Sequence, residues 1–215
     1  MRAKKGAAGW EAFYREGSSP SVEPDPNLLA PIDFFRRNHV RRVLDLGCGD
    51  GRHLIFLGKL GYEMYGLDFA PTALNHSKER LDREGLHVEL KCGDMSQLPW
   101  PDQYFDAIVS IRVLHHNTIV SVRKALDEIY RVLRPGGYVL ATVAKAPPPR
   151  DWKEGHFAKA GRQTYVPLKG HEKGLPNHFF TEPELRKLLS GFTIILLQED
   201  ASDERRYAFL VQKMQ

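Results

Sequence analysis

The chain has 215 residues, of which 42% are hydrophobic and 27% charged, and its formal net charge is +4. This length fits a single α/β domain over residues 1–215, and the modest positive charge does not by itself require a nucleic-acid partner. Two cysteines form no disulfide framework, and no apolar run suits a signal peptide or a membrane span, so we expect a cytoplasmic protein with no membrane partner.

Residues 1–35 are predicted to form an extension that precedes the core. Trp10, Phe13 and Tyr14 recur at helical spacing within it, and a stretch rich in proline and serine follows over residues 18–26. An aromatic stripe of this kind either docks a helix on the core or closes over a ligand. The spacing alone leaves both interpretations open.

A glycine-rich turn joins the first predicted strand, residues 42–46, to a helix over residues 52–60. Gly47, Gly49 and Gly51 alternate with Cys48 and Asp50, which leaves a bare backbone against which a ligand can lie. The dinucleotide-binding pattern G-x-G-x-x-G places its third glycine one residue later, and no Lys-Ser or Lys-Thr pair of a phosphate-binding loop follows. A plain β-to-α turn remains the alternative.

A second acidic residue follows the next predicted strand, residues 62–67. Asp68 lies roughly 20 residues beyond the glycine turn, where a nucleotide-binding βαβ unit holds ribose hydroxyls on a carboxylate. The alternative is that Asp68 caps the next helix. Pro71 suits the first position of that helix.

Three further landmarks follow in order. A short strand over residues 88–92 leads to Gly93-Asp94-Met95, and the apolar run Phe105–Ile111 predicts a buried parallel strand that leads to His115 and His116. After a helix, residues 133–137 read Leu-Arg-Pro-Gly-Gly. We expect Gly136 or Gly137 to close that helix and a strand to occupy residues 138–143.

Strand and helix alternate over residues 40–143, which predicts parallel strands with right-handed crossovers. Residues 144–180 break the alternation and are too long for a simple connection, so we expect a functional lid or a disordered loop. A capping box from Thr181 to Glu184 starts a helix of about residues 181–190. Strands 192–198 and 206–212 then form a hairpin.

In order, these landmarks resemble the class I S-adenosylmethionine (SAM) methyltransferases, whose first motif is an acidic residue followed by Gly-x-Gly-x-Gly. The resemblance implies a Rossmann-like α/β fold: a mostly parallel seven-stranded sheet with helices on both faces and one antiparallel strand in the C-terminal hairpin. It implies SAM as cofactor, with Asp68 on the ribose, Asp94 on the adenine amino group and Met95 against the adenine ring. The implied cofactor-binding residues are Asp45, Gly47, Cys48, Gly49, Gly51, Asp68, Phe69, Asp94, Met95, Ile111 and His115.

Methyl transfer from SAM is a direct displacement, so a general base is needed only if the nucleophile is protonated. The candidate catalytic residues are His115, His178 and Tyr14. The alternative for the histidine pair is that His115 packs against the cofactor and His116 caps the next helix. The N-terminal aromatics resemble a lid of small-molecule methyltransferases, where an aromatic face attracts a sulfonium. The nine histidines lack metal-ligand spacing, so we expect no metal.

We expect a small-molecule methyl acceptor, held in part by the insertion at residues 144–180. Its cluster of Tyr165, His171, Asn177, His178, Phe179 and Phe180 resembles an acceptor-site segment. Seven basic residues also crowd this region: Lys145, Arg150, Lys153, Lys159, Arg162, Lys169 and Lys173. Such a run is either a solvated face or a cue for a transfer-RNA-modifying methyltransferase. A further alternative is a SAM-binding regulatory subunit without its own turnover.

Overall fold

A computed structural model describes residues 7–17, 22–29, 31–148 and 155–215. Its parallel half contains β1 (Arg42–Leu46), α4 (Arg52–Lys59), β2 (Glu63–Asp68), α5 (Pro71–Arg83), β3 (Glu89–Cys92), β4 (Phe105–Ile111), α6 (Ile119–Val132) and β5 (Leu133–Ala144). Before it come α1 (Ala7–Arg15), α2 (Pro26–Leu29) and α3 (Pro31–Arg37). After it come β6 (Phe157–Lys159), β7 (Thr164–Pro167), β8 (Asn177–His178), α7 (Glu182–Leu188), β9 (Phe192–Asp200) and β10 (Asp203–Lys213).

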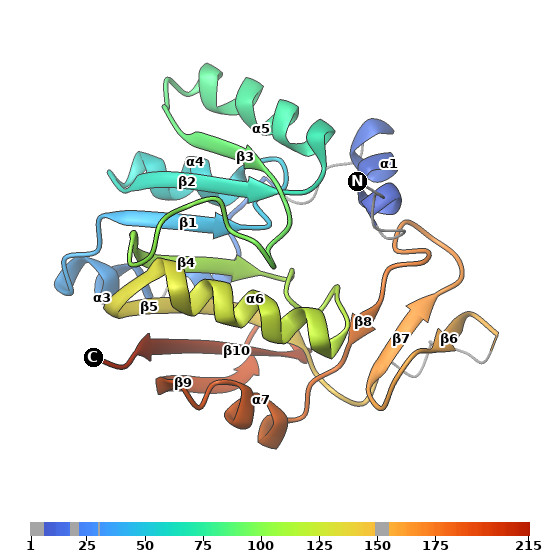
Figure 1. The fold of residues 1–215 in the computed structure, drawn as a ribbon. Coiled ribbons are helices and arrows are strands. Elements are labelled where there is room, and N and C mark those ends of the chain that lie inside the picture. Colours follow the sequence, from blue (N-terminus) through green and yellow to red (C-terminus); the bar gives the residue numbers. More distant parts are fainter. Residues whose placement is uncertain (1–6, 18–21, 30, 149–154) are drawn as a thin grey trace.

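A seven-stranded sheet in the order β3-β2-β1-β4-β5-β10-β9 forms the centre of the molecule (Figure 1). Strands β1 to β5 are parallel to their neighbours, whereas β10 runs antiparallel to both β5 and β9. This confirms the predicted Rossmann-like sheet with one antiparallel strand in a C-terminal hairpin.

Each face of the sheet is covered by helices, because the side chains of the central strands are apolar on both sides. Leu44 and Leu46 of β1 pack with the buried residues of α6 and α7 on one face. Val43 of the same strand packs on the other face with residues of α3, α4 and α5. The alternation along β1 therefore decides which helix layer each side chain meets.

The Leu-Arg-Pro-Gly-Gly segment differs from the prediction. Helix α6 ends at Val132, before either glycine, and β5 already begins at Leu133. Leu133 pairs with Phe105, but the next pair in register is Tyr138 with Ala107, so the intervening residues form a bulge. Gly136 has a left-handed φ of 73°, and such a conformation suits a bulge as well as it suits a helix end.

The structure differs in part from two further predictions. The Thr181 hydroxyl accepts a hydrogen bond from the Glu184 amide at the start of α7, but the Glu184 carboxylate turns to His178 and does not complete the capping box. Part of the insertion at residues 144–180 folds into a small antiparallel sheet, β6-β7-β8, in place of a loop without regular structure. Within the described residues, no helix is long and apolar enough to cross a membrane.

Helix α1 and the small sheet both lie at the carboxyl end of the parallel strands, on the right of Figure 1. Ligands bind to open α/β sheets at this edge, near the point where the strand order reverses. Here that point lies between β1 and β4.

Candidate active site

The turn after β1 forms a cradle of bare backbone at the carboxyl edge of the sheet. Gly47, Gly49 and Gly51 have φ values of 80°, 53° and 85°, a region that residues with a Cβ rarely adopt. A Cβ at Gly47 would overlap the Val113 side chain, and a Cβ at Gly49 would lie 2.5 Å from the Tyr14 hydroxyl oxygen. The sequence therefore needs glycine both for the backbone conformation and for the close approach of neighbours.

Asp68 ends β2 directly beside this cradle. One carboxylate oxygen accepts the Gly49 amide and the other accepts the Ala70 amide, both at 2.9 Å. Burial raises the pKa of Asp68, while these backbone donors act to lower it. The Phe69 amide is a third backbone donor to this carboxylate. The two oxygens together offer about four lone pairs, so acceptor capacity remains for a ribose hydroxyl. Asp68 does not cap the second or third amide of α5; Ala70 is the N-cap residue.

Asp94 and Met95 follow β3 at the same edge. Asp94 Oδ1 accepts hydrogen bonds from the Ser96 amide at 2.9 Å and the Ser96 hydroxyl at 2.8 Å, which fixes the carboxylate on the turn. Met95 is buried, and its sulfur accepts from the Asn117 amide group at 3.5 Å. Both residues directly follow β3, which pairs with β2, the strand that Asp68 ends.

Cys48, Phe69 and Ile111 complete the predicted cofactor set. Burial raises the pKa of the Cys48 thiol, so this residue is a neutral packing group in the turn. Phe69 packs against a small cluster that includes Tyr14, and Ile111 is buried in the core at the end of β4.

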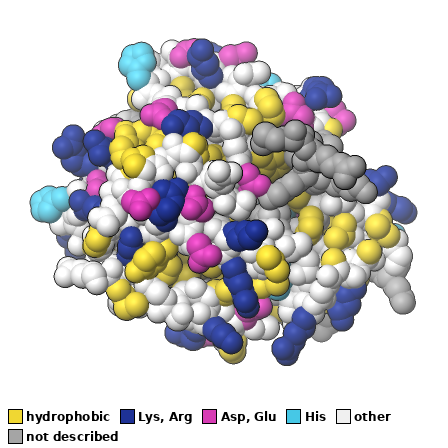
Figure 2. Space-filling model, viewed as in Figure 1, with side chains coloured by type: hydrophobic (Ala, Val, Ile, Leu, Met, Phe, Trp, Pro, Cys, Tyr) yellow, Lys and Arg dark blue, Asp and Glu magenta, His cyan; other side chains and the backbone are white. Residues whose placement is uncertain are grey.

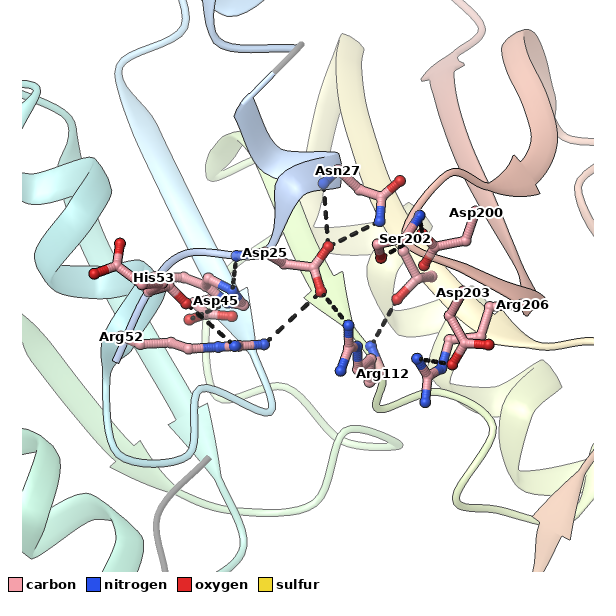
Figure 3. Close-up of polar contacts among 12 residues, drawn as sticks. Asp25, Asn27, Asp45, Arg52, His53, Arg112, Asp200, Ser202, Asp203 and Arg206 are labelled. Atoms are coloured by element: carbon pink, nitrogen blue, oxygen red, sulfur yellow. Dashed lines mark hydrogen bonds and ion pairs between the residues drawn. The ribbon is translucent and has the colours of Figure 1, made fainter. Parts of the chain in front are cut away.

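Asp45 is buried in β1, two residues before the glycine turn, and its Oδ2 has no hydrogen-bond partner among the described residues. Burial raises the pKa of Asp45 to about 7. His53 Nδ1 lies 3.8 Å from this oxygen, and His53 Nε2 accepts the Asp25 amide at 3.3 Å (Figure 3). Burial lowers the pKa of His53 to about 3, so the ring is neutral and carries its proton on Nδ1, facing Asp45.

An ion-pair network around the buried Asp25, which the sequence analysis missed, joins the N-terminal segment to the sheet (Figure 3). Asp25 is 1% exposed, and its Oδ2 lies 2.9 Å from Arg112 and 3.9 Å from Arg52. Arg112 follows β4 with an unusual φ of 63°, and its amide donates to the Thr142 hydroxyl at 3.0 Å. Strained backbone of this kind persists where several contacts hold it. The network fixes the segment around Asp25 beside the glycine turn.

Helix α1 covers the same edge of the sheet. The Glu11 carboxylate accepts the Thr72 amide at 3.1 Å and the Thr72 hydroxyl at 2.5 Å, which supplies the cap that α5 lacks at its own N-cap. On its other side, Gly9 packs so closely on the insertion that a Cβ there would overlap the His171 carbonyl. The Trp10 ring lies 5.1 Å from the His171 ring. The predicted lid therefore contacts both α5 and the insertion.

Tyr14, a candidate catalytic residue, is buried under α1 with its hydroxyl over Gly49. Burial, followed by the charges of Asp68 and Asp50, raises the pKa of Tyr14 strongly. The phenol is therefore a neutral hydrogen-bonding group at ordinary pH, and we do not propose it as a base.

The histidine pair lies just beyond β4. His115 is buried, and in the part of the chain that the structure describes its Nδ1 has no hydrogen-bond partner. Burial lowers its pKa well below the usual range. The next helix is capped by Thr118, whose hydroxyl accepts the Ser121 amide, so the interpretation of His116 as a helix cap is wrong. His116 Nδ1 instead lies 2.7 Å from Asn177 Oδ1.

His178, the third candidate, has both ring nitrogens engaged within the protein. Its Nδ1 lies 2.8 Å from the Thr164 hydroxyl and its Nε2 3.1 Å from Glu184 Oε2. The ring is 3% exposed. These contacts tie β7, β8 and α7 together, so the geometry favours a structural role.

The structure describes five of the seven basic residues that the sequence places in the insertion. Lys145 pairs with Glu199, and the other four described residues of the set are exposed: Lys159, Arg162, Lys169 and Lys173. Arg150 and Lys153 lie outside the described residues. No group of three His, Cys, Asp or Glu side chains that could hold a metal ion occurs in the part of the chain that the structure describes.

The comparisons with known proteins point to one family. Residues 44–141 match the family described as "Methyltransferase domain". The chain carries a class I SAM-dependent methyltransferase domain. This confirms the predicted family and its cofactor, SAM; the matched segment runs from β1 to β5 and contains the glycine turn, Asp68 and the histidine pair.

Three relatives show what this chain is similar to. A demethylmenaquinone methyltransferase of Thermus thermophilus is 33% identical over 141 residues, 65% of this chain and 62% of that protein. A ubiquinone biosynthesis O-methyltransferase of Rhodopseudomonas palustris is 25% identical over 191 residues, 87% of this chain and 69% of that protein. A tRNA (carboxymethyluridine(34)-5-O)-methyltransferase of Arabidopsis thaliana is 33% identical over 135 residues, 62% of this chain but 31% of that protein.

Two solved structures share the fold. A SAM-dependent methyltransferase of Methanosarcina mazei has a TM-score of 0.74 at 21% identity, covering 89% of this chain and 99% of its own. The 1,6-didemethyltoxoflavin-N1-methyltransferase of Burkholderia thailandensis, solved with S-adenosylhomocysteine, has a TM-score of 0.72 at 21% identity and covers 100% and 92%. At this identity the likeness shows the fold, and the acceptor has to be argued from the site.

Proposed function

We propose that this protein transfers the methyl group of SAM to a small-molecule acceptor. The observation that carries the proposal is the meeting of three features at one edge of the sheet: the bare glycine turn, the Asp68 carboxylate beside it, and an aromatic lid above it. SAM supplies the electrophilic methyl group when it is bound. The protein has to bind the two reactants, align them and exclude water.

The residues present fit the cofactor. Gly47 and Gly49 allow the left-handed backbone of the turn, and Asp68 beside it retains acceptor capacity for a ribose hydroxyl. Two buried polar atoms have no hydrogen-bond partner among the described residues: Asp45 Oδ2 on β1, and His115 Nδ1 in the loop after β4. Such atoms are costly unless a ligand or water pairs with them, which supports a polar ligand at this edge.

A small acceptor is favoured because α1 and the insertion already enclose this edge. Trp10 contacts the rings of both His116 and His171, at 5.5 and 5.1 Å, and a polymer would have to displace that cover. On the face shown in Figure 2, lysine and arginine side chains are interspersed with acidic ones and form no continuous basic surface. Quinone-pathway methyltransferases are among the relatives.

The second candidate is a transfer-RNA-modifying methyltransferase, which the relative from Arabidopsis thaliana and the exposed basic residues of the insertion favour. One experiment separates the two. The purified protein is incubated with methyl-labelled SAM and either a panel of phenols, quinols, amines and thiols or bulk transfer RNA. Label in a small product supports the proposal, and label in RNA that falls steeply with added salt supports the second candidate. S-adenosylhomocysteine binding without label in either fraction would indicate a SAM-binding subunit without its own turnover.

A further inference from the structure

The insertion determines which ring nitrogen of His116 carries the proton. Asn177 Nδ2 donates to Glu172 Oε2 at 3.0 Å and to the Leu175 carbonyl at 3.3 Å. Both partners only accept, so the amide nitrogen of Asn177 has to face them and its Oδ1 has to face His116. This oxygen lies 2.7 Å from His116 Nδ1, so Nδ1 carries the proton and Nε2 is left with the lone pair.

The backbone holds this arrangement in place. The amide of His178 donates to the carbonyl of His115 at 2.8 Å, which joins β8 directly to the loop that carries the histidine pair. Asn177, the neighbour of His178, is thereby held opposite His116. Asn177 itself is buried, with 3% of its surface exposed. Glu172 lies behind it and forms the far end of a chain that runs from His116 through Asn177 to a carboxylate.

The surroundings place His116 at the proposed reaction site. It follows β4 by five residues at the carboxyl edge of the sheet, its ring lies 4.1 Å from that of His115, and the Trp10 ring of the lid lies 5.5 Å away. No hydrogen bond to His116 Nε2 occurs among residues 7–17, 22–29, 31–148 and 155–215. The His116 imidazole is thus neutral, has a fixed tautomer and an available Nε2, and is linked through Asn177 to the Glu172 carboxylate. This is the arrangement of a general base.

We propose that His116 is the general base of this methyltransferase, positioned by Asn177 and Glu172, and that the acceptor is an aromatic or enolic hydroxyl. This rests on the proposed function. In the step, the acceptor oxygen forms a bond to the methyl carbon as the bond from that carbon to sulfur breaks, and S-adenosylhomocysteine leaves. The hydroxyl proton moves to His116 Nε2. The Asn177 oxygen and the Glu172 carboxylate stabilise the resulting imidazolium, which later loses its proton to solvent.

The strength of the base selects the class of acceptor. Burial is the main cause that lowers the pKa of His116, and the neighbouring His171 and Arg206 lower it further. The Glu172 carboxylate and the hydrogen bond to Asn177 act in the opposite direction and raise it. A weak base assists proton transfer best from a fairly acidic hydroxyl, which favours phenols and enols over aliphatic alcohols. The Trp10 ring, 5.5 Å from the His116 ring, also places an aromatic side chain of the lid beside this base.

The first test reads the tautomer in the protein without ligand. Imidazole ¹⁵N shifts of the wild type should show His116 as the neutral form protonated on Nδ1. Asn177→Leu should give a mixture of the two His116 tautomers. The control variant His87→Ala changes an exposed histidine between α5 and β3, and it should leave the His116 shifts unchanged. A wild-type His116 protonated on Nε2 would overturn the proposal.

The second test measures methyl transfer with 4-methylcatechol and with 4-nitrocatechol, whose hydroxyl ionises more readily. His116→Ala should lower kcat by about 10²–10⁴-fold with 4-methylcatechol, and by much less with 4-nitrocatechol, because an ionised acceptor needs no base. Glu172→Gln should move the acid limb of kcat/KM to lower pH, because it removes a charge that raises the pKa of His116.

The controls separate this proposal from the proposed function. S-adenosylhomocysteine affinity should be unchanged in His116→Ala and in Glu172→Gln. Equal losses on both catechols would mean that His116 is structural, and no turnover of either catechol by a wild type that binds S-adenosylhomocysteine would overturn the acceptor class. Failure of the wild type to bind S-adenosylhomocysteine would instead overturn the proposed function.

Discussion

The buried pair of Asp45 and His53 predicts an opposite pH dependence of stability in its two single variants. Burial raises the pKa of Asp45 from 3.8 to about 7. Between these values the unfolded chain has lost a proton that the folded chain keeps, so the free energy of unfolding falls as pH rises. Burial lowers the pKa of His53 from 6.5 to about 3. Between these values the unfolded chain binds a proton that the folded chain does not, so the free energy of unfolding rises with pH.

The two contributions nearly cancel in the wild type from about pH 4 to pH 6.5, because each has a slope of about 1.4 kcal/mol per pH unit and the signs are opposite. His53→Gln leaves the Asp45 contribution alone, so its stability relative to wild type should fall by about 1.4 kcal/mol per pH unit across that window. Asp45→Asn leaves the His53 contribution alone, so its relative stability should rise by a similar amount.

Urea unfolding at several pH values and constant ionic strength measures this. The difference from wild type is the quantity to plot, since the other titrating groups contribute equally to all three proteins. Lines of opposite slope for the two variants are expected. Curves parallel to that of the wild type would show that neither residue holds a shifted pKa in the folded protein, and the account of the site's electrostatics would be wrong.

Three further predictions concern the site and its lid. Asp68→Ala should weaken S-adenosylhomocysteine binding by about 1.5–3 kcal/mol in calorimetry, the worth of hydrogen bonds to a charged group; unchanged affinity would remove Asp68 from the site. Gly49→Val should abolish that binding while circular dichroism shows a folded chain, because its Cβ enters the cradle and meets the Tyr14 hydroxyl; normal affinity would mean that the turn does not touch the ligand. Gly9→Val should lower turnover more than cofactor affinity, because its Cβ would overlap the His171 carbonyl and lift α1. Full turnover in this variant would reduce the lid to a structural element.

The sheet and the cofactor cradle could be predicted from the sequence because their signals are local. Apolar runs at strand length, glycines at alternate positions and an acidic residue at a strand end each lie within a few neighbouring residues. The bulge at residues 134–137 was missed because the same Pro-Gly-Gly signal also suits a helix end. The strands β6 to β8 were missed because segments of two to four residues are too short to show a period.

The polar contacts of the site could not be predicted, because they join segments that lie far apart in the chain. Asp25 meets Arg112, and His116 meets Asn177, only after folding. His178 was selected as a candidate base from its neighbours in sequence, whereas Thr164 and Glu184 occupy both of its nitrogens. A histidine's role depends on what its two nitrogens meet, and the sequence alone does not state that.

The central claim is that the glycine turn and Asp68 form a SAM site. Isothermal titration of the wild-type protein with S-adenosylhomocysteine, and separately with NADH, tests it most directly, because both ligands carry an adenosine whose ribose a βαβ carboxylate can hold. The account predicts micromolar binding of S-adenosylhomocysteine at one site per chain and no binding of NADH. Binding of NADH without binding of S-adenosylhomocysteine would contradict it.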